Sequence, residues 1–297
     1  MVMPGSQLDG ASVYELLDRE CVTFTAAVPT VWLGLLQYLR AEGLSLPHLR
    51  KVVIGGAALS EAILRAFEDD YGVEVVHCWG MTETSPIGAF GGLPPALVEA
   101  SAEIRTVQKL KQGRSPFGIA MKIADGLGNR LPHDGIASGH LSVSGFAVAS
   151  AYYGGEGGDI LDADGFFDTG DVATIDRFST MKITDRAKDV IKSGGEWISS
   201  IDIENIVLSH SGVANAAAIG VPHPKWDERP VLIIERRQEQ PSLSAEEVRA
   251  FLDGRIAKWW MPDACVFVDA IPLGPTGKID KIKLREMYAS GEIAPAA

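Results

Sequence analysis

The chain is poor in cysteine and in positive charge. Its 297 residues include three cysteines, Cys21, Cys78 and Cys265, whose spacing matches neither a metal site nor a disulfide framework. We therefore expect a reducing, cytoplasmic setting. Lys and Arg total 27 against 39 Asp and Glu, a formal net charge of -12. Such an acidic balance argues against non-specific binding to nucleic acid.

Long hydrophobic runs and targeting signals are also lacking. The most apolar stretch, residues 26–39, contains Pro29 and is too short to span a bilayer. The first ten residues lack the charged and apolar regions of a signal peptide. We expect neither a leader nor a transmembrane segment. The hydrophobic share of 46% suits a globular protein of one large or two medium domains.

Strand and helix patterns alternate through the first part of the chain. Residues 28–39 predict an apolar helix, and residues 51–54 and 74–77 predict two short strands. Between these strands Ser60 is the predicted cap of a helix whose Ile63, Leu64 and Phe67 share one face. This order predicts a parallel sheet, in which ligands bind beyond the carboxyl ends of the strands.

The later segments have a different character. Residues 119–124, 140–144, 171–176 and 181–184 predict a small antiparallel sheet or barrel. After them we expect a helix at 199–208, strands at 213–220, 231–235 and 264–268, and a helix from a Ser244–Glu247 capping box to about Trp260. The predicted fold class is α/β. A partial large domain over residues 1–186, with a parallel αβ sheet and a small β-barrel, precedes a small α+β domain over residues 187–297.

Two segments follow predicted strands, where ligands bind to such sheets, and the segment after Trp79 could hold phosphates. Gly80 lets the backbone turn closely around a ligand, Thr82 offers a hydroxyl to a phosphate oxygen, and Glu83 offers a carboxylate to a magnesium ion. The other predicted strand ends at Gly55 and Gly56. The alternative is an ordinary polar loop packed by Trp79.

Further along, Asp171 in the order Asp-Thr-Gly-Asp could accept hydrogen bonds from both hydroxyls of a ribose, although Asp-Gly turns are common. Residues 185–197 are more informative because they combine cations, paired glycines and Trp197 in one short segment. Arg186 can donate to ribose or phosphate oxygens. The alternative is a charged linker followed by a tight turn. Lys278 projects from a Pro-Thr-Gly-Lys turn, where a lysine is usually just solvated.

Taken together and in this order, the segments resemble the adenylate-forming superfamily of acyl-CoA synthetases, luciferases and peptide-synthetase adenylation domains. The segments WGMTETSP and KSGGEWISSIDIEN resemble those of bacterial medium- or long-chain fatty-acyl-CoA synthetases and of relatives that activate methylmercaptopropionate. The resemblance covers essentially the whole chain. It implies an acid–CoA ligase that uses ATP, Mg²⁺ and coenzyme A, forms an acyl-adenylate with release of pyrophosphate, and then forms a thioester with release of AMP.

The resemblance also implies a role for each matching residue. Lys278, Thr82 and Glu83 would be catalytic, with Glu83 on the metal, and Lys188 would be the hinge about which the small domain rotates. Nucleotide contacts are implied for Gly55, Gly56, Ala57, Trp79, Gly80, Met81, Thr82, Asp171 and Arg186. Contacts with coenzyme A are implied for Lys192, Ser193, Gly194, Gly195, Glu196 and Trp197.

One element of the family pattern has no match. Relatives carry a loop rich in Ser, Thr and Gly, with a lysine, upstream of the segment at Trp79, and it wraps the ATP phosphates. We therefore expect a carboxy-terminal fragment with impaired activity. Two alternatives remain open: an inactive or split module that binds nucleotide or CoA, with a complementing amino-terminal half or a second copy as partner, and an adenylation domain that loads a carrier protein.

Overall fold

The computed structural model describes residues 1–238, 240–274 and 279–295. The chain divides into two compact units. Unit 1 comprises Met1–Thr169 and Ala173–Ile183, and unit 2 comprises Gly170–Val172 and Thr184–Ala297. Within the described ranges, none of the helices has the length and hydrophobicity to span a bilayer. The domain boundary predicted between residues 186 and 187 stays a prediction.

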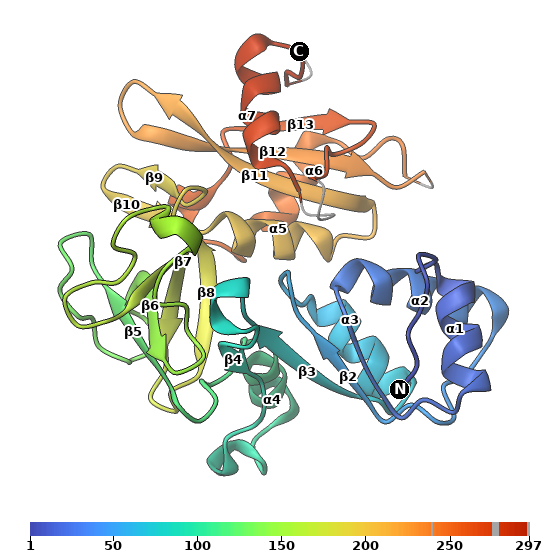
Figure 1. The fold of residues 1–297 in the computed structure, drawn as a ribbon. Coiled ribbons are helices and arrows are strands. Elements are labelled where there is room, and N and C mark those ends of the chain that lie inside the picture. The colour runs from blue at the N-terminus through green and yellow to red at the C-terminus, as the bar shows by residue number, and fades with distance from the viewer. Residues whose placement is uncertain (239, 275–278, 296–297) are drawn as a thin grey trace. The chain divides into compact units, whose positions relative to one another are not determined.

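Unit 1 begins with the parallel sheet that the sequence predicts. The strands run in the order β1 (Phe24–Ala27), β2 (Lys51–Ile54), β3 (Glu74–Trp79) and β4 (Ala89–Phe90), with the first three parallel and β4 antiparallel to β3 (Figure 1). The accompanying helices are α1 (Gly10–Arg19), α2 (Pro29–Glu42) and α3 (Glu61–Arg65), and α3 continues into a π-helical turn, η1 (Ala66–Asp70). Strand β1 was not predicted, because its four residues merge with the apolar run of α2.

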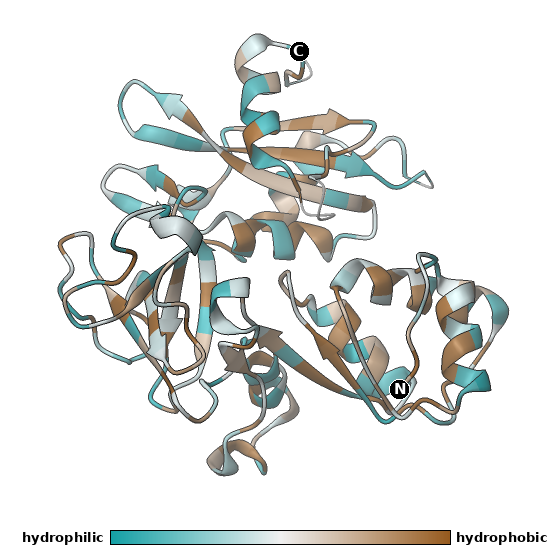
Figure 2. Cartoon of the chain, viewed as in Figure 1, coloured by the Kyte–Doolittle hydropathy of each residue, from teal (hydrophilic) through white to brown (hydrophobic). Residues whose placement is uncertain are grey.

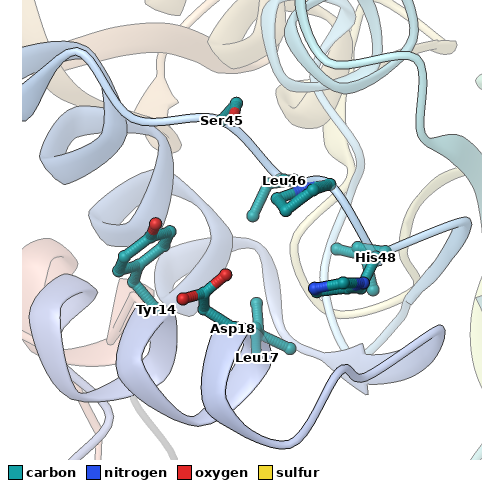
Figure 3. A pocket seen from close by; sticks show the side chains of 8 residues that line it. Tyr14, Leu17, Asp18, Ser45, Leu46 and His48 are labelled. Carbon is teal, nitrogen blue, oxygen red and sulfur yellow. The ribbon is translucent and has the colours of Figure 1, made fainter.

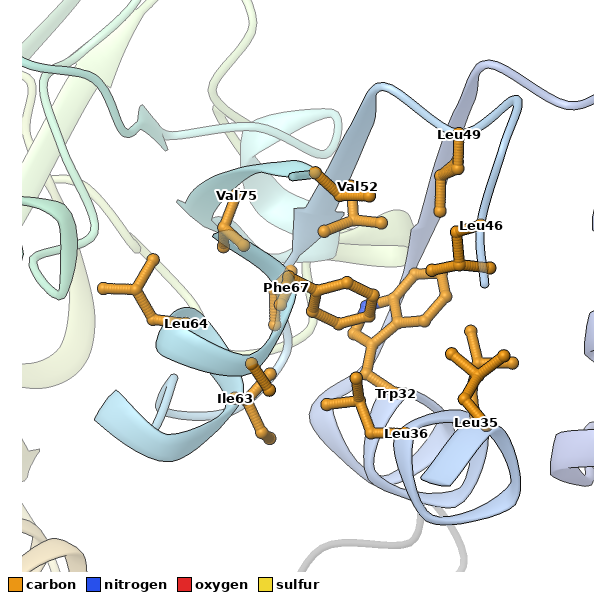
Figure 4. Packing of buried hydrophobic residues seen from close by; sticks show 14 of the residues in the cluster. Trp32, Leu35, Leu36, Leu46, Leu49, Val52, Ile63, Leu64, Phe67 and Val75 are labelled. Carbon is orange, nitrogen blue, oxygen red and sulfur yellow. The ribbon is translucent and has the colours of Figure 1, made fainter. Parts of the chain in front are cut away.

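The core of this part lies between α2, α3 and the sheet. Figure 4 shows Trp32 and Leu36 of α2 facing Phe67, with Val52 of β2 close by. The rings of Trp32 and Phe67 meet edge to face with centroids 5.7 Å apart, a favourable aromatic arrangement. Ser60 caps α3 as predicted, since its hydroxyl accepts from the backbone N–H of Ile63 at 3.3 Å. Figure 2 shows hydrophobic colouring along β2 and β3.

The second sheet has the order β5 (Ile119–Ala124), β6 (Ser138–Gly145), β7 (Phe167–Ile175) and β8 (Met181–Arg186). It is an open four-stranded sheet, and the sheets of the described residues include no closed barrel, so that part of the prediction is wrong. Four short strands cannot close on themselves while their side chains fill the interior. Ahead of this sheet lie the short turns η2 (Thr82–Thr84) and η3 (Pro95–Leu97) and helix α4 (Ala102–Lys109), and η4 (Tyr153–Gly155) precedes β7.

Unit 2 is built on one sheet with helices on both faces. Its strands run β10 (Glu196–Ile198), β9 (Ile191–Ser193), β12 (Asp227–Arg236) and β11 (Val213–His223), and β13 (Ala264–Val268) pairs in parallel with β12. Helices α5 (Ser200–Leu208) and α6 (Ala245–Leu252) pack on one face. Helix α7 (Lys281–Ser290) packs on the other face, which is why residues 216–220 of β11 are buried without interruption (Figure 1).

The helix that begins at the Ser244–Glu247 capping box is shorter than predicted. Both bonds of the box form, but α6 ends at Leu252 because Asp253 is extended and Gly254 has a φ of +73°. Trp260 belongs to a separate 3-10 turn, η5 (Lys258–Trp260). The apolar residues after Leu252 therefore do not continue the helical face that the sequence suggested.

Candidate active site

Two loops leave the carboxyl ends of neighbouring parallel strands in unit 1. Gly55 follows β2, and Trp79 ends β3, the strand paired with it. A Cβ at Gly55 would lie 2.7 Å from the Cys78 sulfur, so the loop passes against β3 at a distance that only glycine permits. Gly56 has a φ of +82°, which also favours glycine, and Ala57 follows it. The structure thus brings residues 55–57 beside the end of β3, where the sequence predicts an adenine contact.

The turn after Trp79 is fixed by its backbone. A Cβ at Gly80 would lie 1.7 Å from the Pro86 carbonyl oxygen. Thr84 is fully buried, and its hydroxyl donates to the Pro86 carbonyl at 2.8 Å and accepts from the Met81 N–H at 3.0 Å. These contacts tie both ends of the 3-10 turn η2 together. As a result Thr82 is exposed and Glu83 half-buried at the surface of the turn.

Trp79 is more deeply packed than an adenine-stacking ring needs to be. It is 9% exposed and belongs to the cluster that covers the second sheet, with Ala89 and Ile123. Gly88 lies flat against its ring, since a Cβ there would come within 2.2 Å. Packing thus accounts for much of the aromatic character at this position, and the adenine contact stays a prediction.

Glu83 is held from two directions by residues that the sequence did not single out. The hydroxyl of Tyr152 donates to Glu83 Oε1 at 2.7 Å, and the backbone N–H of Ala149 donates to the Glu83 carbonyl at 2.8 Å. This hydrogen bond, with the nearby negative charge, raises the pKa of Tyr152. No pattern in the sequence separates Tyr152 from Tyr153, because both lie in a Gly-rich run after a strand.

The chemistry of this turn fits a magnesium ion shared with phosphates. Thr82 and Glu83 supply hard oxygen ligands, and Mg²⁺ in such sites uses one or two carboxylates together with phosphate oxygens and water. Among the described residues no group of three or more His, Cys, Asp or Glu is placed to form an all-protein metal site. A metal at Glu83 would accordingly depend on the phosphates for its remaining ligands.

His77 lies beneath the loops and is not suited to act as an acid or base for them. Its ring is 1% exposed, and Nδ1 lies 2.9 Å from the Leu110 carbonyl oxygen. Burial lowers its pKa, so the ring is neutral at physiological pH. A neutral ring that donates from Nδ1 helps to order β3 rather than to carry a proton.

In unit 2 the structure brings Asp171 and Arg186 together. Arg186 Nε lies 2.9 Å from Asp171 Oδ1, and the side chains are 46% and 4% exposed respectively. Gly170 has a φ of +68°, and its carbonyl accepts from the Ala187 N–H at 2.9 Å. This backbone bond holds β7 next to the end of β8. The pair therefore presents a carboxylate and a guanidinium as one unit, which suits recognition of sugar hydroxyls and phosphate.

The paired glycines of the segment at 192–197 form a hairpin turn. Ser193 pairs with Glu196 and Lys192 with Trp197, and the two central residues, Gly194 and Gly195, have φ of +63° and +87°. Two-residue hairpins of this kind require positive φ at both central positions. The hairpin turn thus explains why glycines occupy these two positions. This reason adds to the close approach to coenzyme A that the sequence predicts.

The hairpin is anchored by residues that the sequence did not single out. Glu228 accepts from the Lys192 N–H at 2.9 Å, and the Trp226 carbonyl accepts from the Gly194 N–H at 2.8 Å. Arg229 donates to the Ser193 hydroxyl at 3.2 Å and to the Trp259 carbonyl at 2.8 Å. The contact of residues 223–226 with the hairpin is a tertiary feature that no local pattern reveals.

The predicted hinge residue, Lys188, lies in a short connection between β8 and β9. Its carbonyl accepts from Arg285 Nη2 at 3.4 Å, and Arg285 pairs with Asp189 at 2.8 Å. The predicted catalytic residue Lys278 lies outside the described residues, as do Thr276 and Gly277. The roles of Lys188 and Lys278 stay predictions.

A small surface hollow lies elsewhere in unit 1. Figure 3 shows Tyr14 and Asp18 of α1 facing Leu46 and His48 of the loop that follows α2. The loops at the ends of β2 and β3 do not contribute to its lining. We assign it no part in the candidate site.

Comparison with known proteins supplies the family. Residues 1–153 match the AMP-binding enzymes, and residues 202–278 match the AMP-binding enzyme C-terminal domain. The chain is 49% identical over 290 residues to a 3-methylmercaptopropionyl-CoA ligase of Ruegeria pomeroyi, covering 97% of this chain and 53% of that protein. It is 44% identical over 290 residues to a long-chain-fatty-acid–CoA ligase of Thermus thermophilus, with the same two coverages.

A solved structure agrees with these matches. ATP-bound MatB from Rhodopseudomonas palustris superimposes with a TM-score of 0.80 at 28% identity, covering 94% of this chain and 53% of that one. The chain spans about half the length of the curated relatives it matches. The match over residues 1–153 takes in both strand-end loops of unit 1, and the chain belongs to the family of AMP-binding enzymes.

Proposed function

We propose that this chain handles nucleotide and coenzyme A in an AMP-forming acid–CoA ligase that activates a fatty acid or a similar carboxylic acid. The relatives named above are CoA ligases for long-chain fatty acids and for 3-methylmercaptopropionate. The observation that carries the proposal is the Asp171–Arg186 pair, a nearly buried carboxylate within β7 and a half-exposed guanidinium at the end of β8. Asp171 would bind the ribose hydroxyls of AMP, and Arg186 would bind ribose or phosphate oxygens.

In the first half-reaction an oxygen of the acid attacks the α-phosphorus of ATP, and the bond to the β-phosphate breaks to release pyrophosphate. The Thr82 hydroxyl would donate to the α-phosphate, and Lys278 would stabilise the negative charge that develops at the transition state. A magnesium ion held by Glu83 would neutralise phosphate charge when bound. Tyr152 fixes the direction of the Glu83 carboxylate through their 2.7 Å bond.

In the second half-reaction the thiolate of coenzyme A attacks the acyl carbonyl, and the mixed anhydride bond breaks to release AMP. We infer that residues 189–297 rotate about Lys188 between the two steps, so that Lys278 leaves the nucleotide and the hairpin at 192–197 approaches the pantetheine arm. Trp197 would supply an apolar surface beside the pantetheine arm. The two-residue turn of the hairpin consists of glycines, so no side chain projects from it. One site would then serve two reactions through domain movement.

The proposal is tested by separating the two steps. Purified chain is titrated with AMP by calorimetry, and it is given dodecanoyl-adenylate plus CoA to measure dodecanoyl-CoA formation. We expect AMP binding and thioester formation, both weakened in Asp171→Ala. ATP-dependent formation of dodecanoyl-CoA from dodecanoate is measured alongside, with octanoate and 3-methylmercaptopropionate as competing acids. Absence of both AMP binding and thioester formation would overturn the proposal, and transfer to a carrier protein in preference to CoA would favour the adenylation-domain alternative.

A further inference from the structure

Two serines at the start of α5 contact strand β8 across the predicted hinge residue. The Ser200 N–H donates to Asp185 Oδ2 at 2.6 Å, and the Ser200 hydroxyl donates to Asp185 Oδ1 at 3.0 Å. The hydroxyl of Ser199 donates to the backbone carbonyl of Thr184. In the sequence Lys188 lies between the two groups. These bonds therefore join the segment before the hinge to the domain after it.

A lysine from the far end of the same unit completes the contact. Lys281 is the first residue of α7. Its Nζ donates to the Ser200 hydroxyl at 2.6 Å and forms an ion pair with Glu204 Oε1 at 2.7 Å. Its side chain is 11% exposed, and Asp185 is 1% exposed. Charges this well buried are stable only when they are paired, and removal of one partner strongly affects the rest. The Ser200 hydroxyl thus connects Lys281 to Asp185.

The contact ties together segments that the proposed function uses in the first half-reaction. Asp185 precedes Arg186 and accepts from its backbone N–H at 2.8 Å. Lys281 follows Lys278 by three positions in the sequence. The chain between them is held at Asp280, whose N–H donates to the Pro272 carbonyl at 2.9 Å. One buried network therefore reaches from Asp185, next to the proposed ribose contact, to Lys281, three positions after the proposed catalytic lysine.

We propose that Asp185, Ser200 and Lys281 form a latch that holds the hinge in one of the two arrangements that the half-reactions need and opens for the other. The inference rests on the proposed function, because it needs rotation about Lys188. Rotation there carries Ser199, Ser200 and Lys281 away from Thr184 and Asp185, so the bonds across the hinge must break. Ser200 and Lys281 are positioning residues, which act through Arg186 and Lys278 and do not touch substrate.

The expected size of the effect follows from the bonds involved. A hydrogen bond from a hydroxyl to a buried carboxylate shifts an equilibrium by roughly tenfold or more when it is removed. Ser200→Ala keeps the backbone N–H bond to Asp185 and leaves the Lys281–Glu204 pair in place. It should therefore weaken the latch by roughly tenfold without unfolding the domain. Lys281→Met should weaken it further, and Lys281→Arg should restore part of the effect.

The test compares Ser200→Ala and Lys281→Met with two matched controls, Ser209 at the C-cap of α5 and Lys283 within α7. Ser209→Ala removes a hydroxyl bonded to the carbonyl of Ile206 within α5, and Lys283→Met removes an exposed lysine of α7. The first readout is trypsin cleavage after Arg186 and Lys188 below the melting temperature. We expect cleavage to be roughly tenfold faster in Ser200→Ala and unchanged in both controls.

The second readout compares the half-reactions. We expect Ser200→Ala to slow one step, either acyl-adenylate formation or thioester formation from supplied dodecanoyl-adenylate, by roughly tenfold, while the other step stays equal or rises. Equal slowing of both steps, or cleavage rates that match the controls, would overturn the latch. If the unmodified chain performs neither step, the proposed function fails, and the cleavage comparison still decides whether the contact restrains the hinge.

Discussion

The two predicted nucleotide-binding segments are ordered by different means. In unit 1 the turn after β3 is shaped by glycines that leave no room for a side chain, as at Gly80 and Gly88. In unit 2 the segment around Arg186 is ordered by charge, through its pair with Asp171 and through the buried Asp185 beside it. Steric fit is insensitive to pH and salt, whereas paired charges respond to both. The first segment is thus expected to stay rigid as pH and salt change, and the second to be adjustable.

The largest effect is expected at Gly80, where a substitution tests the steric explanation of the turn most directly. Gly80→Ala places a Cβ 1.7 Å from the Pro86 carbonyl oxygen, which is backbone and cannot swing away. We expect a loss of about 2–3 kcal/mol in the free energy of unfolding, as for other overpacked sites. Urea denaturation measures it. Gly92→Ala is the matched control, because nothing lies within 4 Å of its added Cβ. Equal stability of the two variants would contradict the account of the turn.

A substitution at Asp171 tests the charge-ordered side. Asp171→Ala removes a nearly buried carboxylate that pairs with Arg186 and that we expect to accept from ribose hydroxyls. Hydrogen bonds to a charged acceptor are among the strong ones, so AMP should bind roughly 10- to 100-fold more weakly. Calorimetric titration with AMP provides the measurement. Asp168→Ala changes an exposed residue on the same strand and should bind AMP as the unmodified chain does.

A substitution at Tyr152, with a smaller expected effect, tests whether its hydroxyl orients the carboxylate of Glu83, the proposed metal ligand. Tyr152→Phe removes only the hydroxyl that donates to Glu83 at 2.7 Å. A neutral donor lost at a partly exposed site should raise the Mg²⁺ concentration needed for half-maximal adenylate formation by about threefold. Binding of Mn²⁺ with ATP, followed by electron paramagnetic resonance, gives a readout without turnover. Tyr153→Phe is the neighbouring control, since Tyr153 is 97% exposed. A threefold change in the control as well would remove any special role for Tyr152.

Local signals predicted many elements of both units, but not strand β1 or helices α4 and α7. Capping residues such as Ser60 and Ser244 marked helix starts correctly, and the strands at 51–54, 119–124 and 264–268 have the predicted bounds. The predicted barrel is an open sheet, because closure depends on strand pairing over long distances. The helix after Ser244 instead stops at Leu252 for a local reason, the extended Asp253 and the positive φ of Gly254, which outweigh the apolar residues that follow.

The residues of the candidate site also divide into those that the sequence predicts and those that only the fold reveals. Motif residues such as Asp171 and Arg186 could be singled out, since their order in the sequence carries the family pattern, and the structure brings this pair together. The residues that contact and orient the motif residues could not be singled out from the sequence. Tyr152 lies 69 positions from Glu83, and Lys281 lies 81 positions from Ser200. A sequence pattern shows which groups recur at short range, but not which distant side chains will meet them in the fold.

The smallest effect is expected in the pH dependence of stability, which distinguishes the buried charge network from surface charge. Burial raises the pKa of Glu204 and of Asp185 above the ordinary carboxyl range. The folded state therefore binds more protons than the unfolded state over the pH range above the ordinary carboxyl values. Stability from these groups is greatest at acid pH and falls as pH rises through their folded pKa values.

Glu204→Gln should flatten that fall, because the amide oxygen can still accept from the Ala218 N–H and from Lys281 but no longer titrates. Glu247→Gln should do the opposite. Hydrogen bonds from Ser244 lower the pKa of Glu247, so this carboxylate stabilises the fold above its ordinary range, and that contribution is lost as pH falls. Urea denaturation between pH 4 and 8 compares the three proteins. Parallel curves for the unmodified chain and Glu204→Gln would mean that the buried network carries no titrating proton, and the contrast between the two segments would then rest on geometry alone.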